Sequence, residues 1–143
     1  MAAFVKYNND SFLDFIIQKA VSFEGLYCYQ IGRSETEAGI GYMFDESFDE
    51  ESDNWVPKKI RIEDYEKIFE NISKINFFKL MEENAGISGF DGATYTCKIM
   101  GAFSDSVLSV DVWNPFKNKD FPETTKFLNI FEEIEKLYNG KTS

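Results

Sequence analysis

A run of carboxylates in the first half of the chain is the feature best suited to chemistry. Residues 45–53 read Asp-Glu-Ser-Phe-Asp-Glu-Glu-Ser-Asp, which places six acids in nine positions. Carboxylates at this density can bind a divalent cation, work in pairs as general acid and base, or dock on a cationic partner. The rest of the sequence discriminates between these chemistries.

Charge is concentrated around this run. The window 35–70 holds 12 acidic and 4 basic residues, whereas the whole chain carries 25 and 15, for a net charge of −10. Such a balance disfavours nucleic acid and anionic membranes as partners and favours a cationic protein. The tightest basic cluster, Lys58, Lys59 and Arg61, follows the acidic run closely, so we expect it to neutralise part of the run within the molecule.

A metal site of the EF-hand type does not fit the acidic run. That loop requires glycine at its sixth position and an acid at its twelfth. Counting from Asp45, these positions hold Glu50 and Val56. We therefore predict no metal and no cofactor. The alternatives for the run are a solvated loop, a docking surface and a looser Ca²⁺ or Mg²⁺ site.

Catalytic residue sets are missing from the sequence. The chain contains no histidine, so Ser34, Ser88, Ser104 and Ser106 have no base to activate them. Cys28 and Cys97 fit no metal-binding spacing, and we expect two buried, reduced thiols. The glycines between residues 86 and 92 match no phosphate-binding loop and predict a turn. We predict that the protein is not an enzyme. A hydrolase with two buried carboxylates of raised pKa remains the catalytic alternative.

The elements that position these residues begin with an expected helix. Apolar residues recur at three- and four-residue spacing, with Asp10 or Ser11 as its cap and Glu24-Gly25 as its end. The stripe consists of Phe12, Phe15, Ile16, Ala20 and Phe23.

Two strands, an acidic loop and a second helix are expected next. Residues 26–31 and 39–44 have strand composition, and the polar segment 32–38 joins them as a hairpin. The acidic loop follows, and Ile60 and Ile62 alternate with charged neighbours in a third strand. A helix is then predicted from Ile62 to about Met81, with Glu63, Asp64 and Glu66 near its start, where the helix dipole favours anions.

A second hairpin and a closing helix complete the pattern. Residues 94–99 and 108–113 alternate as strands around a connection at 101–105, and Pro115 stops the second strand. The final helix starts near Pro122 and ends at Gly140, with Phe127, Phe131, Ile134 and Tyr138 on its inner face. We predict a single α+β domain over residues 1–143, with an antiparallel sheet of about five strands and about three helices packed mainly on one face.

One segment carries a family resemblance. Residues 90–95 read Phe-Asp-Gly-Ala-Thr-Tyr, residues 110–115 read Val-Asp-Val-Trp-Asn-Pro, and an amphipathic helix closes the chain. This pattern resembles small bacterial immunity proteins of polymorphic toxin and contact-dependent inhibition systems, over residues 90–140. The resemblance implies a small cytosolic, non-enzymatic protein that neutralises a toxin, often a nuclease, by stoichiometric binding. Gly92, Trp113 and Pro115 are structural in this pattern, and the resemblance supplies no binding residues.

The sequence therefore supports two function hypotheses. The first is an immunity protein that blocks a cognate toxin with a basic surface, and the second is a small intracellular adaptor with a basic protein partner. No export signal or membrane-spanning stretch is visible, so we expect a cytoplasmic protein that binds no membrane and no nucleic acid. Phe48 and Trp55 are either partner anchors or anchors of the loop to its own core. The expected partner-binding residues are Asp45, Glu46, Phe48, Asp49, Glu50, Glu51, Asp53, Trp55, Glu63 and Asp64.

Overall fold

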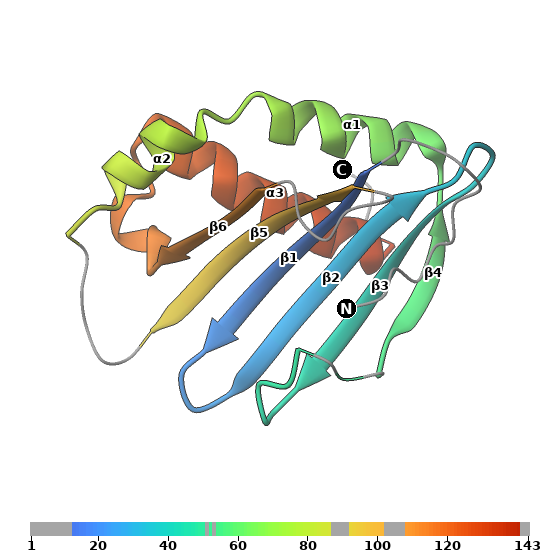
Figure 1. Ribbon diagram of the computed structural model, residues 1–143, viewed down its shortest axis with the longest axis horizontal. Helices are drawn as coiled ribbons and strands as arrows, with labels where there is room; N and C mark the ends of the chain where they lie inside the picture. The colour runs from blue at the N-terminus through green and yellow to red at the C-terminus, as the bar shows by residue number, and fades with distance from the viewer. Residues whose placement is uncertain (1–12, 51, 53, 87–91, 102–107, 141–143) are drawn as a thin grey trace.

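The fold is an α+β arrangement built on one antiparallel sheet. The computed structural model describes residues 13–50, 52, 54–86, 92–101 and 108–140. Six strands run in the order β4-β3-β2-β1-β5-β6, so β1 and β2 lie at the centre (Figure 1). Their bounds are β1 Leu13–Val21, β2 Gly25–Arg33, β3 Ala38–Asp45, β4 Val56–Ile60, β5 Ala93–Gly101 and β6 Leu108–Trp113.

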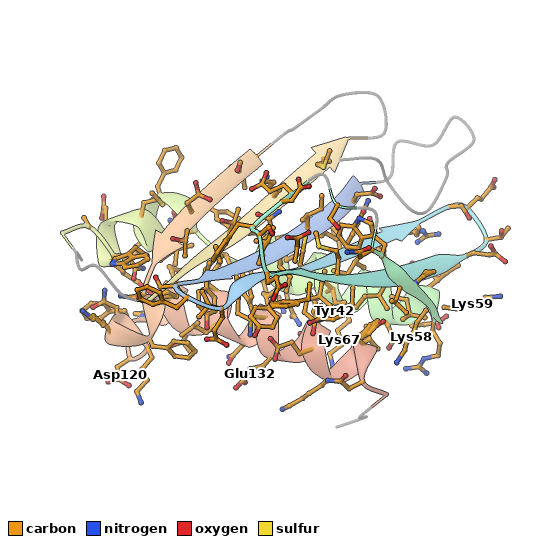
Figure 2. All side chains as sticks on the ribbon, turned by 90° about the horizontal axis from the view of Figure 1, so that it is seen from below. Tyr42, Lys58, Lys59, Lys67, Asp120 and Glu132 are labelled. Carbon is orange, nitrogen blue, oxygen red and sulfur yellow. The ribbon has the colours of Figure 1, made fainter. Side chains whose placement is uncertain are left out.

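The helices cover one face of this sheet, as the edge-on view in Figure 2 shows. They are α1 Ile62–Ser73, α2 Phe77–Glu83 and α3 Pro122–Tyr138, with a 3₁₀ turn η1 over Pro115–Asn118. The predicted fold class is confirmed, and the sheet has six strands instead of about five. We call the side under the helices the helix face and the opposite side the open face.

The main core lies between the helices and the helix face. Buried side chains of α1 and α3 meet every second residue of the strands, including Phe15 and Ile17 of β1. Rings of Tyr95 and Phe131 lie 4.9 Å apart, and those of Phe127 and Phe131 lie 5.1 Å apart. Burial of this apolar surface is the main source of stability for a domain of this size. The predicted inner face of the last helix is confirmed, because all four of its residues are buried.

The first predicted helix is wrong, because residues 13–21 form the central strand β1. This strand pairs with β2 on one side and β5 on the other. Its residues 14–18 are all buried, since both faces of the strand are covered. A strand buried on both faces has a continuous apolar run that periodicity alone does not distinguish from a helix. The caps proposed at Asp10 and Ser11, and Phe12, lie outside the described residues.

The second predicted helix is two helices. Its start at Ile62 is confirmed, but α1 ends at Ser73 and α2 begins after Asn76. The Asn76 side chain accepts a hydrogen bond from the Lys79 backbone N–H at 3.0 Å, which caps the new helix. The Asn76 N–H donates to Glu123 Oε1 at 2.7 Å, which ties the break to α3.

The predicted hairpins are confirmed, with one shifted strand. β2 and β3 join through a four-residue turn in which the Ser34 N–H donates to the Glu37 carbonyl at 2.7 Å. β5 and β6 pair as predicted. Of the connection expected at 101–105, Gly101 belongs to β5, and residues 102–105 lie outside the described residues. The third strand is shifted, because β4 spans Val56–Ile60 and Ile62 already belongs to α1. The turn predicted between 86 and 92 lies mostly outside the described residues.

The β4 edge of the sheet is protected. β4 carries Pro57, which has no N–H to donate, and the exposed Lys58 and Lys59. Proline and lysine on an edge oppose pairing with another chain.

The two cysteines are buried free thiols, as expected. Cys97 belongs to the helix-face core, whereas Cys28 belongs to a small open-face cluster. β1 runs between their strands, so the side chains point to opposite sides of the sheet. No helix in the described part of the chain is long and apolar enough to cross a membrane.

Candidate functional site

The acidic loop, residues 45–55, connects β3 to β4 at one end of the sheet. It begins with a tight turn, in which the Asp45 carboxylate accepts a hydrogen bond from the Ser47 N–H at 2.7 Å. The Phe48 N–H donates to the Asp45 carbonyl at 3.2 Å. Asp45 therefore shapes the start of the loop, while Glu46, Asp49 and Glu50 are exposed beyond it.

The end of the loop is anchored on the open face. Trp55 is half-buried and packs against the open-face cluster. This cluster consists of Ile16, Leu26, Cys28 and Met43. Trp55 was expected to anchor either a partner or the loop itself, and in the structure it packs against the protein's own core. Phe48 is exposed, and Glu51 and Asp53 lie outside the described residues.

An ion pair with a distant strand holds the middle of the loop. Lys98 of β5 lies with its Nζ 3.6 Å from Glu50 Oε2. The side chain of Lys98 shares the open face with Ile16, which it faces across the β1–β5 pair. The loop therefore folds back over the open face. The cation that pairs with Glu50 lies about fifty positions away in sequence.

The expected neutralisation of the loop by the neighbouring basic cluster is wrong for the pairs that the structure describes. Lys58 Nζ donates to the Tyr138 carbonyl at 2.8 Å and lies 4.3 Å from the Tyr138 ring centroid. Lys59 pairs with Glu37 at 3.5 Å, and Arg61 pairs with Asp64 at 3.0 Å. Figure 2 shows Lys58 and Lys59 side by side at the β4 edge, where β4 leads into α1.

Glu63 and Asp64 do not join the acidic loop. They follow β4, which runs five residues away from the loop. At about 3.3 Å per residue, this places them on the order of 17 Å from it. Asp64 accepts from the Arg61 backbone and side chain and so completes the N-terminal cap of α1, and this contact lowers its pKa. Both acids line an open groove of about 590 Å³ between β3, β4, α1 and the end of α3.

The open face also carries a buried carboxylate. Asp14 accepts a hydrogen bond from Gln30 Nε2 at 2.9 Å, and burial raises its pKa to about 6. A second buried acid of raised pKa, which the two-carboxylate hydrolase requires, is not present among the described residues. Within the same residues, no three potential ligands gather into a metal site.

Sequence reasoning missed the neighbour of the acidic loop. The turn between β1 and β2 packs directly against the loop at Gly25, where a Cβ would lie 2.8 Å from the Asp45 carbonyl oxygen. Its exposed residues, Phe23 and Glu24, extend the acidic loop into a broader surface. The signal in the sequence is Glu24-Gly25. These residues complete the turn between β1 and β2 instead of ending a helix.

No protein-family model matches the chain, and no curated protein sequence matches it.

Proposed function

We propose that this protein is an immunity protein, which binds a cognate bacterial toxin stoichiometrically and blocks it through the acidic loop. The observation that carries the proposal is the way in which the loop is built. Its two ends are fixed by the Asp45 turn and by Trp55, while Glu46, Phe48 and Asp49 lie exposed between them. A fixed, charged and aromatic segment is typical of protein-binding surfaces.

The charge pattern supports a basic partner. The cations that follow the loop in sequence pair with Glu37, Asp64 and the Tyr138 carbonyl. An acidic surface accelerates association with a basic protein and makes the rate sensitive to salt. A toxin that cleaves nucleic acid needs a basic cleft for phosphates, and a row of carboxylates is complementary to such a cleft.

A growth-protection assay tests the proposal. The gene directly upstream is expected to encode a large secreted protein, and its C-terminal region is expressed in a susceptible bacterium with and without this chain. Restored growth and a stoichiometric complex support the proposal. Continued killing together with no complex contradicts it, and a complex with a basic housekeeping protein alone supports the adaptor instead.

Charge variants then test the role of the acidic loop. The triple variant Glu46→Gln, Asp49→Asn, Glu50→Gln is expected to lower the association rate about tenfold at low salt, and to reduce its salt dependence. The matched control removes three exposed acids from the helix layer, Glu82→Gln, Asp120→Asn and Glu132→Gln (Figure 2 labels the last two). Equal association rates for the two triple variants would contradict the role of the loop.

A further inference from the structure

Two phenylalanines occupy a backbone conformation that their side chains disfavour. Phe23 has a φ of 66° and Phe48 has a φ of 60°, both in the left-handed region. Glycine and asparagine are the residues that usually occupy this region, because a Cβ there crowds the following carbonyl. Phe23 lies in the turn between β1 and β2, and Phe48 lies in the acidic loop.

Both rings are also exposed to solvent. The exposed fraction is 92% for Phe23 and 44% for Phe48. The Phe23 ring buries little surface on folding, and the left-handed backbone costs conformational energy at both positions. Glycine or asparagine would adopt this backbone at either position at lower cost, so the turns themselves do not require phenylalanine.

The two turns are in contact with each other. A Cβ on Gly25 would lie 2.8 Å from the Glu46 Cα and 2.9 Å from the Phe44 ring, so the two segments are in direct contact. The rings of Tyr27 and Phe44 lie 4.8 Å apart beside this contact. Figure 1 shows both turns at the same end of the sheet. We call Phe23, Tyr27, Phe44 and Phe48 the aromatic patch.

We propose that the aromatic patch is the anchor site for an arginine-rich surface of the protein partner. This inference rests on the proposed function, which it deepens by naming the contact chemistry. Glu24 and Glu46 lie in the two turns that carry Phe23 and Phe48, and Glu24 Oε1 accepts a hydrogen bond from the Tyr27 hydroxyl at 3.1 Å, which places this carboxylate beside a ring of the patch. A guanidinium stacks on aromatic faces while it pairs with carboxylates, which an ammonium does less well. Rings within an acidic border are therefore complementary to arginine.

Exposed phenylalanines elsewhere lack these features. Phe78 is 88% exposed but lies within the helix α2, and Phe116 lies in η1 with its ring 5.5 Å from Tyr95. Neither has a positive φ. Phe78 therefore provides a control of equal side-chain size at a different place on the molecule.

An NMR titration with short peptides tests the site directly. Uniformly ¹⁵N-labelled full chain is titrated with an arginine–glycine repeat peptide, and with lysine–glycine and glutamate–glycine peptides of equal length. We expect the arginine peptide to shift the amides of residues 22–25 and 44–49, and to bind about threefold more tightly than the lysine peptide. Equal affinities for arginine and lysine, or shifts confined to other segments, would overturn the inference.

Glycine variants separate binding from folding. The double variant Phe23→Gly, Phe48→Gly is expected to bind the arginine peptide about fivefold more weakly, because its carboxylates remain but its rings are gone. Its urea midpoint should rise, because glycine adopts the left-handed region without strain. The variant Phe23→Asn, Phe48→Asn should behave similarly. The control Phe78→Gly should lower the urea midpoint and leave peptide binding unchanged.

The outcomes distinguish this inference from the proposed function. Protection by the wild type and equal protection by the glycine variant would overturn the inference and leave the immunity function standing. Failure of the wild type to protect, with arginine-peptide shifts at the aromatic patch, would overturn the immunity function and leave the anchor site standing.

Discussion

The two faces of the sheet differ in the apolar packing and the hydrogen bonding of their buried side chains. On the helix face, one continuous core joins α1, α2 and α3 to the strands. On the open face, the buried apolar cluster among the described residues consists of Ile16, Leu26, Cys28 and Met43, with Ala20, Trp55 and Met100 packed against it. Among the described residues, every buried side-chain atom without a hydrogen-bond partner belongs to a strand position on the open face. These atoms are Asp14 Oδ1, Gln18 Nε2, Gln30 Oε1 and Trp113 Nε1.

Most of the stabilising apolar burial therefore lies on the helix face, whereas the open face contains buried polar atoms that lower the free energy of unfolding. Unpaired buried polar atoms cost free energy, and a burial-shifted carboxylate adds to that cost. The acidic loop and Trp55 lie on the same, weaker face. Sites that bind partners are frequently less optimised for folding than the core that supports them. The helix face therefore acts as the scaffold, and the open face and its adjoining turns carry the candidate surface.

Neighbouring isoleucines of β1 offer the strongest test of this comparison. Ile16 faces the open-face cluster and Ile17 faces the helix-face core, and each is 1% exposed. We expect Ile17→Ala to cost about 4–5 kcal/mol of unfolding free energy and Ile16→Ala about 2–3 kcal/mol, because the larger core relaxes less around a cavity. Urea denaturation measures both unfolding free energies. Equal losses in the two variants would contradict the proposed difference between the faces.

Asp14 provides a test through pH. Its folded pKa of about 6 exceeds the ordinary 3.8, so the folded protein holds this proton more tightly than the unfolded chain does. Its contribution to stability is therefore greatest below pH 4, and it falls as the pH rises from 4 to 6. Asp14→Asn should remove this slope and raise stability at pH 7 by about 1–2 kcal/mol after solvent screening. Denaturation midpoints at several pH values measure it.

A matched variant controls for the loss of a negative charge. Asp111 lies exposed on the same face and accepts a hydrogen bond from Thr96 at 2.6 Å. Asp111→Asn should retain the wild-type slope between pH 4 and 6, because Asp14 is still present. If the slope disappears in this variant as well, the assignment to Asp14 is wrong.

The cysteines report on the opening of each face separately. Burial raises the pKa of both the Cys28 and the Cys97 thiol to about 12, so neither reacts readily in the folded state. Local opening of the smaller open-face cluster should expose Cys28 first. We expect a thiol reagent to label Cys28 about tenfold faster than Cys97, as followed by peptide mass spectrometry. Labelling of both cysteines at a single rate would indicate that the two faces open together.

The ion pair between Glu50 and Lys98 is expected to give the smallest effect. Both side chains are partly exposed, so Lys98→Ala should cost only about 0.2–1 kcal/mol. Its larger consequence should be faster hydrogen exchange in residues 46–50, because the loop loses one attachment to β5. Unchanged exchange in the loop would mean that Trp55 and the Asp45 turn hold it without help.

Much of the fold was predictable from local patterns. The hairpins of β2 with β3 and β5 with β6 followed from alternation and polar turns, and α3 followed from its apolar period and its first-turn proline. β1 was not predictable in this way, because Phe15, Ile16 and Ile17 face two different layers that both bury them. Only the tertiary structure distinguishes that run from a helical stripe.

The candidate site was predictable in its acids but not in its neighbours. Charge density identified residues 45–53, and the exposure of Glu46, Asp49 and Glu50 agrees with a surface loop. The partner of Glu50 and the contact at Gly25 come from strands that are distant in sequence, so no local pattern indicates them. The separation of Glu63 from the loop likewise depends on the direction of β4.

The attachment of β4 to the end of α3 has a consequence for the order in which the protein is made. Lys58 donates to the Tyr138 carbonyl, and the Tyr138 hydroxyl donates to the Val56 carbonyl at 2.9 Å. An edge strand has only one neighbour in its sheet, so these contacts supply its second support. A ribosome releases the first strands well before residue 138. The acidic loop therefore reaches its final shape late in synthesis, when α3 docks and holds the strand that follows it.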